Sequence, residues 1–540
     1  MKAAVEEIEV TMDELDGLLE QAKAALPPRE YETLRKVVNA YVYITGKIAD
    51  ERTTIQWLRQ LLGSKSEKTK KVLERAGLGA GGNGQESTQG HETTGGNDKP
   101  KARGHGRHGA EAYSGAERIE VTHASLKRGE RCPGCGKGKL YRRKKPRVIV
   151  RIRGAAPLQA DLYELETLRC NLCGEVFTAK PPAGVGEAKY DPSAGAMIGL
   201  LKYGTGLPFY RLDGLQASVG IPLPASTQWE IVEDAAGELM PVYRALVQEG
   251  AQGEILHNDD TGMTVLELMK KRPDPEEDGV SAERTGVFTS GIVSTREGRR
   301  IALFFTGRRH AGENLAEVLK KRAVELAPPI QMCDALSRNF PKGLDAIVAN
   351  CMAHGRRQFV NVAESFPEEC RHVLEVLKEV YQNDATARER QLSPDERLRF
   401  HQVKSGPVME ALQEWLSAQL DEKKVEPNSR LGKAIAYMQR HWPELTLFLR
   451  EPGAPLDNNI CERALKRVIL HRKNALFFRT KNGARVGDLF MSLIHTCELS
   501  DADPFEYLTE ILRNTHLLEK NPQAWLPWSY RDTLAQIRSP

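Results

Sequence analysis

Three acidic residues that are far apart in the sequence, Asp259, Asp334 and Glu462, occupy positions where their carboxylates could act together. Asp259 lies in a strand-like run, Asp334 directly follows another, and Glu462 falls in the first turn of a helical run that extends through Leu470. Carboxylates that meet at one sheet edge repel one another unless divalent cations lie between them. Ligands made only of oxygen select Mg²⁺ or Mn²⁺, and two such ions would activate the attacking oxygen and stabilise the leaving one in a phosphoryl displacement. The sequence therefore predicts a catalytic magnesium or manganese site at these residues.

Each acid also has a simpler interpretation when it is taken alone. Asp260 competes with Asp259 for the first position, and the second acid could cap a helix. Glu462 could close a capping box with Asn459 and pair with Lys466 one turn later. The three acids together are harder to explain in this way than each acid by itself, which favours the catalytic interpretation.

The elements predicted around the acids outline a ribonuclease-H-like α/β core in residues 249–500. Strands are predicted at 255–266, 287–295, 300–306, 330–333 and 346–351, with a helix at 312–325. In that fold the acids lie on the first strand, after the fourth strand and on a later helix, which are the places that the three acids have here. Amphipathic helices at about 359–449 form an insertion before the helix of Glu462.

Residues 116–180 contain two CxxC pairs with the spacing of a zinc ribbon. The pairs are separated by strand-like runs at 148–152 and 162–165, and they consist of Cys132, Cys135, Cys170 and Cys173. Four thiolates on two tight turns suit a tetrahedral structural Zn²⁺, while an iron–sulfur cluster or redox-active dithiols are the alternatives. A basic run in the same module favours contact with the DNA backbone, and its cations are Arg142, Arg143, Lys144, Lys145 and Arg147.

The segments on either side of this module have distinct patterns. Residues 1–75 include an a/d heptad pattern at 34–62, which predicts a coiled coil that joins two copies of the chain, or else an intramolecular hairpin. Residues 76–115 are a glycine-rich flexible linker. Residues 181–248 resemble a helix-turn-helix, with Ser226 or Thr227 as the cap of its second helix; the alternative is a helical bridge. Residues 501–540 form a C-terminal tail of open role.

The composition indicates a multidomain, largely globular protein. A chain of 540 residues is too long for one core, and 40% of it is hydrophobic against 28% charged. The net charge is only +4, so affinity for nucleic acid must come from local patches. No apolar run approaches the roughly 20 residues that span a bilayer, and the N-terminus lacks the order of a signal peptide. We therefore expect a cytoplasmic, nucleoid-associated protein.

Several segments resemble signature blocks of the insertion sequence 66 family of bacterial DDE transposases. They are 257–261 (HNDDT), 331–334 (QMCD), 351–359 (CMAHGRRQF), 457–463 (DNNICER), 472–478 (RKNALFF), 492–496 (SLIHT) and 503–508 (DPFEYL). The arm ending at 62–68 (LGSKSEK) and the double CxxC module are also similar. The chain departs from the family at Asp260, where the family usually has Glu, and at Met352, where it usually has an aromatic residue.

The resemblance implies a DDE triad of Asp259, Asp334 and Glu462. It also implies DNA as the substrate and companion proteins from the same element, while the predicted coiled coil of the N-terminal arm implies a homo-oligomer. DNA phosphates would be held by Arg463, Lys466, Arg467, Arg472 and Lys473, and also by Arg356, Arg357, His354 and His471; for His354, a satisfied histidine at a helix start is the alternative. The expected reaction is hydrolysis at the element ends followed by attack of the 3′ hydroxyls on target DNA. A non-catalytic DNA-binding regulator and a ribonuclease-H-like nuclease are the alternatives.

Overall fold

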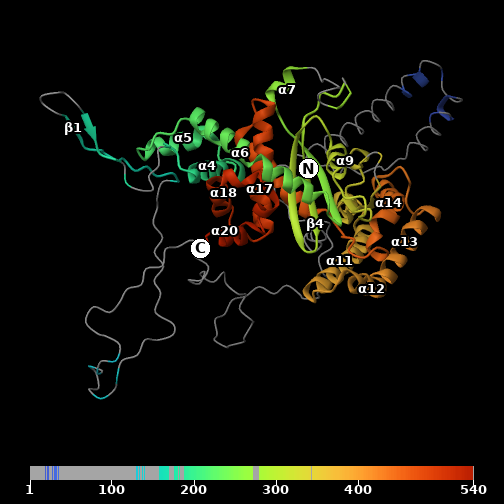
Figure 1. Cartoon of the computed structure of the whole chain (residues 1–540). Coiled ribbons are helices and arrows are strands. Elements are labelled where there is room, and N and C mark those ends of the chain that lie inside the picture. Colours follow the sequence, from blue (N-terminus) through green and yellow to red (C-terminus); the bar gives the residue numbers. More distant parts are fainter. Residues whose placement is uncertain are drawn as a thin grey trace. The chain divides into compact units, whose positions relative to one another are not determined.

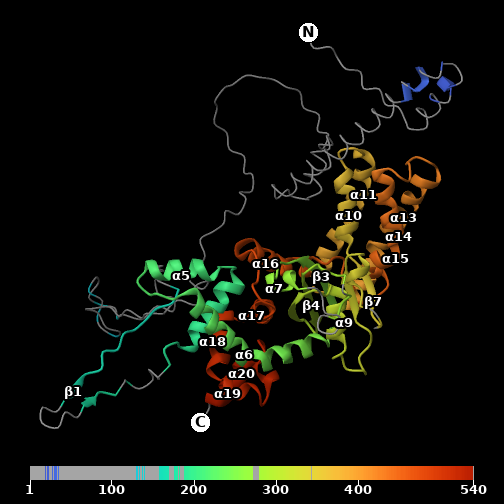
Figure 2. The same cartoon turned by 90° about the horizontal axis from the view of Figure 1, so that it is seen from above.

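The computed structural model describes residues 157–169, 176–180, 182 and 188–538, apart from 272–278, 282, 342 and 344, together with scattered positions before residue 140. The described elements give a mixed α/β architecture (Figures 1 and 2). None of the described helices is long and apolar enough to cross a membrane.

A five-stranded mixed sheet carries Asp259 on one strand, and Asp334 directly follows another of its strands. Its order is β5-β4-β3-β6-β7. The pairs β3–β4 and β4–β5 are antiparallel, and the pairs β3–β6 and β6–β7 are parallel. The strands are β3 (Ile255–Gly262), β4 (Phe288–Arg296), β5 (Arg299–Gly307), β6 (Ile330–Cys333) and β7 (Ile347–Asn350). All five predicted strands are therefore present, although the first ends at Gly262 rather than at residue 266.

The outer strand β5 is protected by a helix, α17 (Lys481–Leu499). Asp488, Ser492 and Thr496 recur every four residues on this helix and therefore share one face. Their oxygens accept hydrogen bonds of 2.6–3.1 Å from alternate backbone N–H groups of β5, those of Thr306, Phe304 and Ala302. The helix thus satisfies the open edge that an outer strand would otherwise present.

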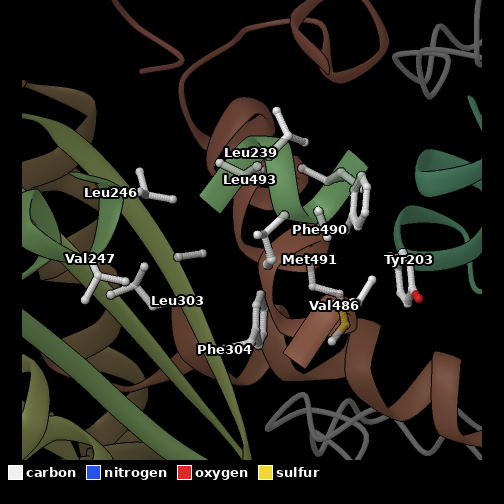
Figure 3. Packing of buried hydrophobic residues seen from close by; sticks show 14 of the residues in the cluster. Tyr203, Leu239, Leu246, Val247, Leu303, Phe304, Val486, Phe490, Met491 and Leu493 are labelled. Carbon is white, nitrogen blue, oxygen red and sulfur yellow. The ribbon is translucent and has the colours of Figure 1, made fainter. Parts of the chain in front are cut away.

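The main hydrophobic core lies between α6 (Ala225–Gly250), α17 and β5 (Figure 3). Leu239 and Leu246 of α6, Phe304 of β5 and Phe490 of α17 are buried in it. The C-terminal elements α18 (Pro504–Arg513), α19 (Thr515–Leu518), the 3-10 helix η5 (Pro522–Trp525) and α20 (Tyr530–Arg538) add further residues to the same cluster, including Tyr507, Trp525 and Tyr530. The tail at 501–540 is therefore part of the core.

The predicted helix-turn-helix region is helical, but one detail of the prediction is wrong. The elements are α4 (Pro192–Gly199), the π-helical η2 (Leu200–Gly204), α5 (Phe209–Ser218) and α6. α6 begins at Ala225, so Ser226 and Thr227 lie inside the helix instead of capping it. The turn is closed by Gln228, whose side chain donates hydrogen bonds to the carbonyl oxygens of Phe209 and Leu223. One face of α6 is buried from Gln228 to Gly250, so the helix packs on its neighbours as the bridging interpretation expects.

Two other predicted elements have different bounds. The helix predicted at 312–325 is α9 (Ala311–Leu319), which ends six residues earlier than expected. The strand predicted at 162–165 is wrong, because residues 161–166 are irregular and exposed. The strand there is β1 (Thr167–Arg169), which pairs with β2 (Val176–Thr178).

The inserted helices form a compact unit of residues Gly355–Gln391 and Val403–Gln439. It contains most of α10 (Met352–Val362), α11 (Pro367–Glu389), α13 (Gly406–Asp421) and α14 (Arg430–Arg440). Its buried residues include Cys370, Leu374, Leu412, Leu416 and Ile435. Most of α12 (Pro394–Lys404) and all of α15 (Trp442–Leu445) belong to the unit that contains the sheet.

Several predictions concern residues outside the described part of the chain. They are the linker at 76–115, nearly all of the arm at 1–75, the basic run at 142–147 and all four cysteines of the predicted zinc ribbon.

Candidate active site

Asp259 and Asp334 lie level with each other on neighbouring strands. His257 of β3 is paired with Met332 of β6 in the parallel register. Two residues further along both strands, Asp259 lies beside Asp334, which is the first residue after β6. Because paired strands are about 4.8 Å apart, both carboxylates belong to the same part of the sheet.

The third acid reaches this place on α16 (Asn459–Ala475), which packs closely on β3 and β4. Gly291 of β4 is paired with Asp259, and a Cβ atom added there would lie 3.0 Å from a methyl group of Leu465. The Sγ of Cys461 donates a hydrogen bond of 3.3 Å to the carbonyl oxygen of Gly291. This close approach places Glu462, the next residue along the helix, near Asp259.

The charges of the three acids act on one another. Burial and, after it, the negative charge of Asp334 raise the pKa of Asp259 to about 7, and the charges of Asp260 and Glu462 act in the same direction. A hydrogen bond of 2.8 Å from the backbone N–H of Asp260 to Asp259 Oδ1 opposes the shift. Repulsion of this kind is relieved when a divalent cation binds between the acids. The site therefore fits such an ion.

Asp260 has different neighbours from Asp259. Its Oδ2 lies 2.7 Å from Nδ1 of His310, the residue that precedes α9, and its Oδ1 lies 3.5 Å from a guanidinium nitrogen of Arg338. The ring of His310 also packs against Phe288, with 4.2 Å between the ring centres. Because successive residues of a strand point to opposite faces, Asp259 faces α16 whereas Asp260 faces α9.

Asn458, the residue that caps α16, connects that helix to β3. Its Nδ2 donates a hydrogen bond of 3.1 Å to the carbonyl oxygen of Asn258, and its Oδ1 lies 3.1 Å from Nδ1 of His257. Burial lowers the pKa of His257 to about 4, so its ring is neutral. The capping box expected between Asn459 and Glu462 is not formed, because Asn458 rather than Asn459 is the cap and its side chain bonds to β3.

The side chain of Asn339 holds Asp334 in place through a hydrogen bond. Its Nδ2 donates a hydrogen bond to Oδ1 of Asp334. Its backbone carbonyl oxygen accepts hydrogen bonds from the side-chain amides of Asn258, at 2.8 Å, and Gln331, at 2.7 Å. The side chains of Asn258, Gln331 and Asn339 are buried. A connected network of buried amides therefore fixes the orientation of Asp334.

A tighter group of potential metal ligands lies at the third acid. Cys351, His354 and Glu462 each offer an atom, and these atoms all lie within 4.8 Å of one another. The Nδ1 of His354 is 3.9 Å from Oε1 of Glu462, and neither atom has a hydrogen-bond partner although both are buried. His354 is thus not the satisfied histidine that was the alternative. Among the described residues, Asp259 and Asp334 do not belong to this group.

Comparison with known proteins agrees with the resemblance of the motifs. The family model described as "Transposase IS66 family" matches residues 188–486, which is more than half of the chain. This chain belongs to the IS66 transposase family. The uncharacterized protein y4jD of Sinorhizobium fredii (strain NBRC 101917 / NGR234) is 28% identical over 67% of this chain and 71% of that protein. The uncharacterized proteins y4hP and y4qI of the same strain are 28% and 24% identical, and the matches span just under two thirds of their lengths, 64% and 62%.

The basic residues of α16 fall into two groups in this IS66-family protein. Arg463, Lys466 and Lys473 are exposed. Arg467 forms an ion pair with Glu498 of α17, and Arg472 donates hydrogen bonds to Thr261 and Gly262 at the end of β3. Arg467 and Arg472 therefore form the second group, and they hold α16 against α17 and β3. Arg356 and Arg357 lie on α10 and already have partners in the chain.

His471 is not placed to hold a phosphate group, which corrects the expectation from its position in the sequence. It is 1% exposed and stacks on Phe478, with Tyr203 further along the same stack. Burial lowers the pKa of His471 to about 3, so the ring carries no charge at neutral pH. It belongs to the core of this family member.

Three residues around the acids were not predicted as functional: His310, which contacts Asp260, Asn339, which contacts Asp334, and Asn458, which caps the helix of Glu462. Asn458 lies within the segment 457–463 that carries the family resemblance, so its place in that motif was an available signal. His310 and Asn339 come from loops around α9 and η3 (Ser337–Asn339), and only the folded chain brings them to the acids.

Proposed function

We propose that this family member is a DDE transposase, which hydrolyses DNA at the ends of a mobile element and joins the freed 3′ hydroxyl groups to target DNA. The observation that carries the proposal is the placement of the acids: Asp259 on β3 lies beside Asp334, which follows β6, and Glu462 lies on α16, the helix that packs on β3 and β4. Family membership supports the same role. A DNA substrate would place the protein with the bacterial nucleoid.

The order of the strands supports a ribonuclease-H-like core. Three antiparallel strands, β3, β4 and β5, are followed by two strands, β6 and β7, that are parallel to β3 on its other side. The acids then fall on the first strand, directly after the fourth strand and on a later helix. That is the arrangement expected from the sequence.

Asp259, Asp334 and Glu462 would hold Mg²⁺ or Mn²⁺, because these residues offer only oxygen ligands. Such ions, when bound, supply an activated oxygen nucleophile and stabilise the leaving oxygen. The chain itself orients the acids: Asp260 N–H donates to Oδ1 of Asp259, and Asn339 donates to Oδ1 of Asp334. Fixed carboxylates lose little freedom when they bind an ion.

DNA would lie along the exposed cations of α16. The first candidates are the exposed cations Arg463, Lys466 and Lys473. Further candidates are Arg356, Arg357 and the basic run at 142–147. Contacts of this kind reach phosphates and carry no sequence information by themselves. The choice of element ends would therefore depend on other parts of the chain.

The zinc ribbon, the coiled-coil arm and the companion proteins remain proposals. Arg131 is bridged to Lys139, and β1 is paired with β2. In the sequence, Cys132 and Cys135 lie between Arg131 and Lys139, and the other CxxC pair lies between β1 and β2. The described residues that flank each CxxC pair are therefore paired with each other, which supports the proposal of a zinc ribbon.

A strand-transfer assay tests the proposed reaction. Labelled DNA with the element ends is incubated with target DNA, Mg²⁺ and the full chain, either wild type or with Asp334→Asn or Glu462→Gln. We expect each substitution to reduce joining by at least about 100-fold. Asp345→Asn is the matched control, because Asp345 is exposed and lies just before β7.

The assay also separates the alternatives. Joining at the wild-type level in either variant would refute the catalytic assignment. A DNA-binding regulator would bind the ends in every variant, and the wild type would join none. A nuclease would cut the ends and leave the target DNA intact.

A further inference from the structure

Three residues from separate elements bring a sulfur, a nitrogen and an oxygen atom together at the third acid. Cys351 follows β7, His354 lies in the first turn of α10, and Glu462 lies in the first turn of α16. Their ligand atoms all lie within 4.8 Å of one another. The sulfur of Cys351 is completely buried, while the side chains of His354 and Glu462 are each 24% exposed. An ion could therefore reach the group from the side of the histidine and the glutamate.

Two of these atoms have no hydrogen-bond partner. The Nδ1 of His354 and the Oε1 of Glu462 are both buried, and they face each other at 3.9 Å. Leaving a buried polar atom unpaired destabilises the folded state, and each case in a native protein needs an explanation. A cation bound between the two atoms would satisfy both.

The mixture of donor atoms selects a different ion from the catalytic one. Sulfur and imidazole nitrogen favour Zn²⁺ or a similar transition metal, whereas Mg²⁺ prefers oxygen alone. In tetrahedral zinc sites with bonds of about 2.0–2.3 Å, the ligand atoms are roughly 3.3–3.8 Å apart. The distance of 3.9 Å between His354 and Glu462 is close to that range.

The surroundings of the sulfur suit a metal-bound thiolate. The backbone N–H of Asn458 donates a hydrogen bond of 3.2 Å to Sγ of Cys351. Donors of this kind around a ligand are typical of metal sites and orient the ligand. Burial raises the pKa of the Cys351 thiol to about 12, so a bound metal must displace its proton.

We propose that Cys351, His354 and Glu462 form a site for Zn²⁺ or a similar transition metal, distinct from the magnesium site and sharing Glu462 with it. The metal site stands on its own geometry. Its consequence rests on the proposed function: zinc bound to Glu462 would compete with the catalytic ions for that carboxylate and would keep the transposase inactive.

Zinc binding by the full chain tests the site directly. The metal-free protein is dialysed against buffered Zn²⁺, and bound zinc is measured for the wild type, Cys351→Ser and His354→Gln. The wild type should bind one more ion per chain than either variant, or bind the last ion with a Kd at least about tenfold lower. Zinc at the proposed ribbon contributes equally to all of them, so the difference reports only this site.

The controls address folding and the specificity of the cysteine. Cys497→Ser replaces another buried, free cysteine, on α17 and outside the group, and it should bind zinc like the wild type. Thermal unfolding without metal checks that each variant is folded. Should Cys351→Ser fail to fold, His354→Gln carries the test. Equal zinc content and equal Kd values in the wild type and a folded variant would overturn the proposal.

A Co²⁺ titration and a strand-transfer assay complete the test. Co²⁺ bound at the site should give a sulfur-to-cobalt charge-transfer absorption band. The intensity of this band should be lower in Cys351→Ser than in the wild type, because the contribution of this site is lost. In Mg²⁺ buffer, added zinc should inhibit the wild type at concentrations at least about tenfold lower than those needed for Cys351→Ser, each compared with itself without zinc. If the wild type binds the extra ion but joins no DNA, the proposed function fails and the metal site remains.

Discussion

The ring of His310 lies 2.7 Å from the carboxylate of Asp260, and this contact separates the roles of two adjacent aspartates. Asp260 is occupied by His310 and Arg338 on one face of β3, whereas Asp259 lies on the other face with α16 and Glu462. The family resemblance left this choice open, because this chain has an aspartate where the family usually has a glutamate. The contacts favour Asp259 as the metal ligand and Asp260 as a residue that positions the strand.

Exchange of each aspartate for asparagine should therefore have different effects. Asp259→Asn should reduce strand transfer by at least about 100-fold with little loss of stability. Asp260→Asn should lower the free energy of unfolding by about 1–3 kcal/mol, because it leaves His310 and Arg338 without a charged partner, and it should retain measurable strand transfer. Joining assays together with urea denaturation distinguish the two. Retained activity in Asp259→Asn with loss in Asp260→Asn would reverse the assignment.

Asn339 should control how tightly the site binds its ion. Asn339→Ala removes the hydrogen bond to Oδ1 of Asp334 and leaves the carboxylate less well oriented. The Mg²⁺ concentration for half-maximal strand transfer should rise by about 10–100-fold, as for other residues that orient metal ligands. Asn514→Ala is the control, because that side chain donates a hydrogen bond to the carbonyl oxygen of Glu510 in the C-terminal helices. An equal shift in both variants would mean that the effect is a general loss of stability.

Gly291 sets the distance between α16 and the sheet. The Cβ of Gly291→Ala would meet Leu465 at 3.0 Å, so the helix that carries Glu462 must move by a few tenths of an ångström or more. We expect a destabilisation of about 1–3 kcal/mol and a loss of strand transfer larger than the stability change explains. Gly307→Ala, where the added atom meets nothing within 4 Å, should leave both properties unchanged. Normal activity in Gly291→Ala would show that the close packing is dispensable.

Asp488 should make the stability of the fold depend on pH. Burial raises its pKa to about 7 from the ordinary value of 3.8, although hydrogen bonds from Thr306 oppose the shift. Between these two values the folded state holds a proton that the unfolded state has lost. The contribution of Asp488 is therefore most favourable below about pH 4, falls as the pH rises to about 7 and stays low above it.

Asp488→Asn removes this titration. The difference in melting temperature between pH 5 and pH 8 should be smaller in the variant than in the wild type, by an amount equivalent to at most about 3 kcal/mol. Part of the wild-type dependence should remain, since the pKa of Asp259 is also raised to about 7. Differential scanning calorimetry at the two pH values measures the effect. An unchanged or larger difference in the variant would show that Asp488 is ionised in the folded protein at pH 5.

The strands around the acids could be predicted because their pattern is local. Apolar runs bounded by turn residues gave β4, β5 and β6 nearly residue by residue, and the turn at Glu297 and Gly298 has the positive φ values of a tight hairpin. Asp259 lies within β3, Asp334 directly follows β6 and Glu462 lies in the first turn of α16. The order of the predicted elements therefore indicated where the acids lie in the fold.

Other features depend on contacts between distant residues. The cap expected at Ser226 or Thr227 is absent, because the residue before α6 is Pro224 and no side chain caps the helix; Gln228, inside the helix, instead donates a hydrogen bond to the carbonyl oxygen of Phe209. His471 follows several cations on α16 and looks equally accessible in the sequence, but the stack with Tyr203 and Phe478 buries it. No local pattern reveals such partners, because the residues that supply them are far away along the chain.

The most direct test of the central claim is the binding of Mn²⁺ measured by electron paramagnetic resonance, which detects the free ion. The wild type, Asp259→Asn, Asp334→Asn and Glu462→Gln are titrated side by side, with Asp345→Asn as the control. If the three acids share divalent ions, each of the three substitutions should weaken Mn²⁺ binding by at least about tenfold, and the control should not. Wild-type affinity in any one of the three would contradict the shared site.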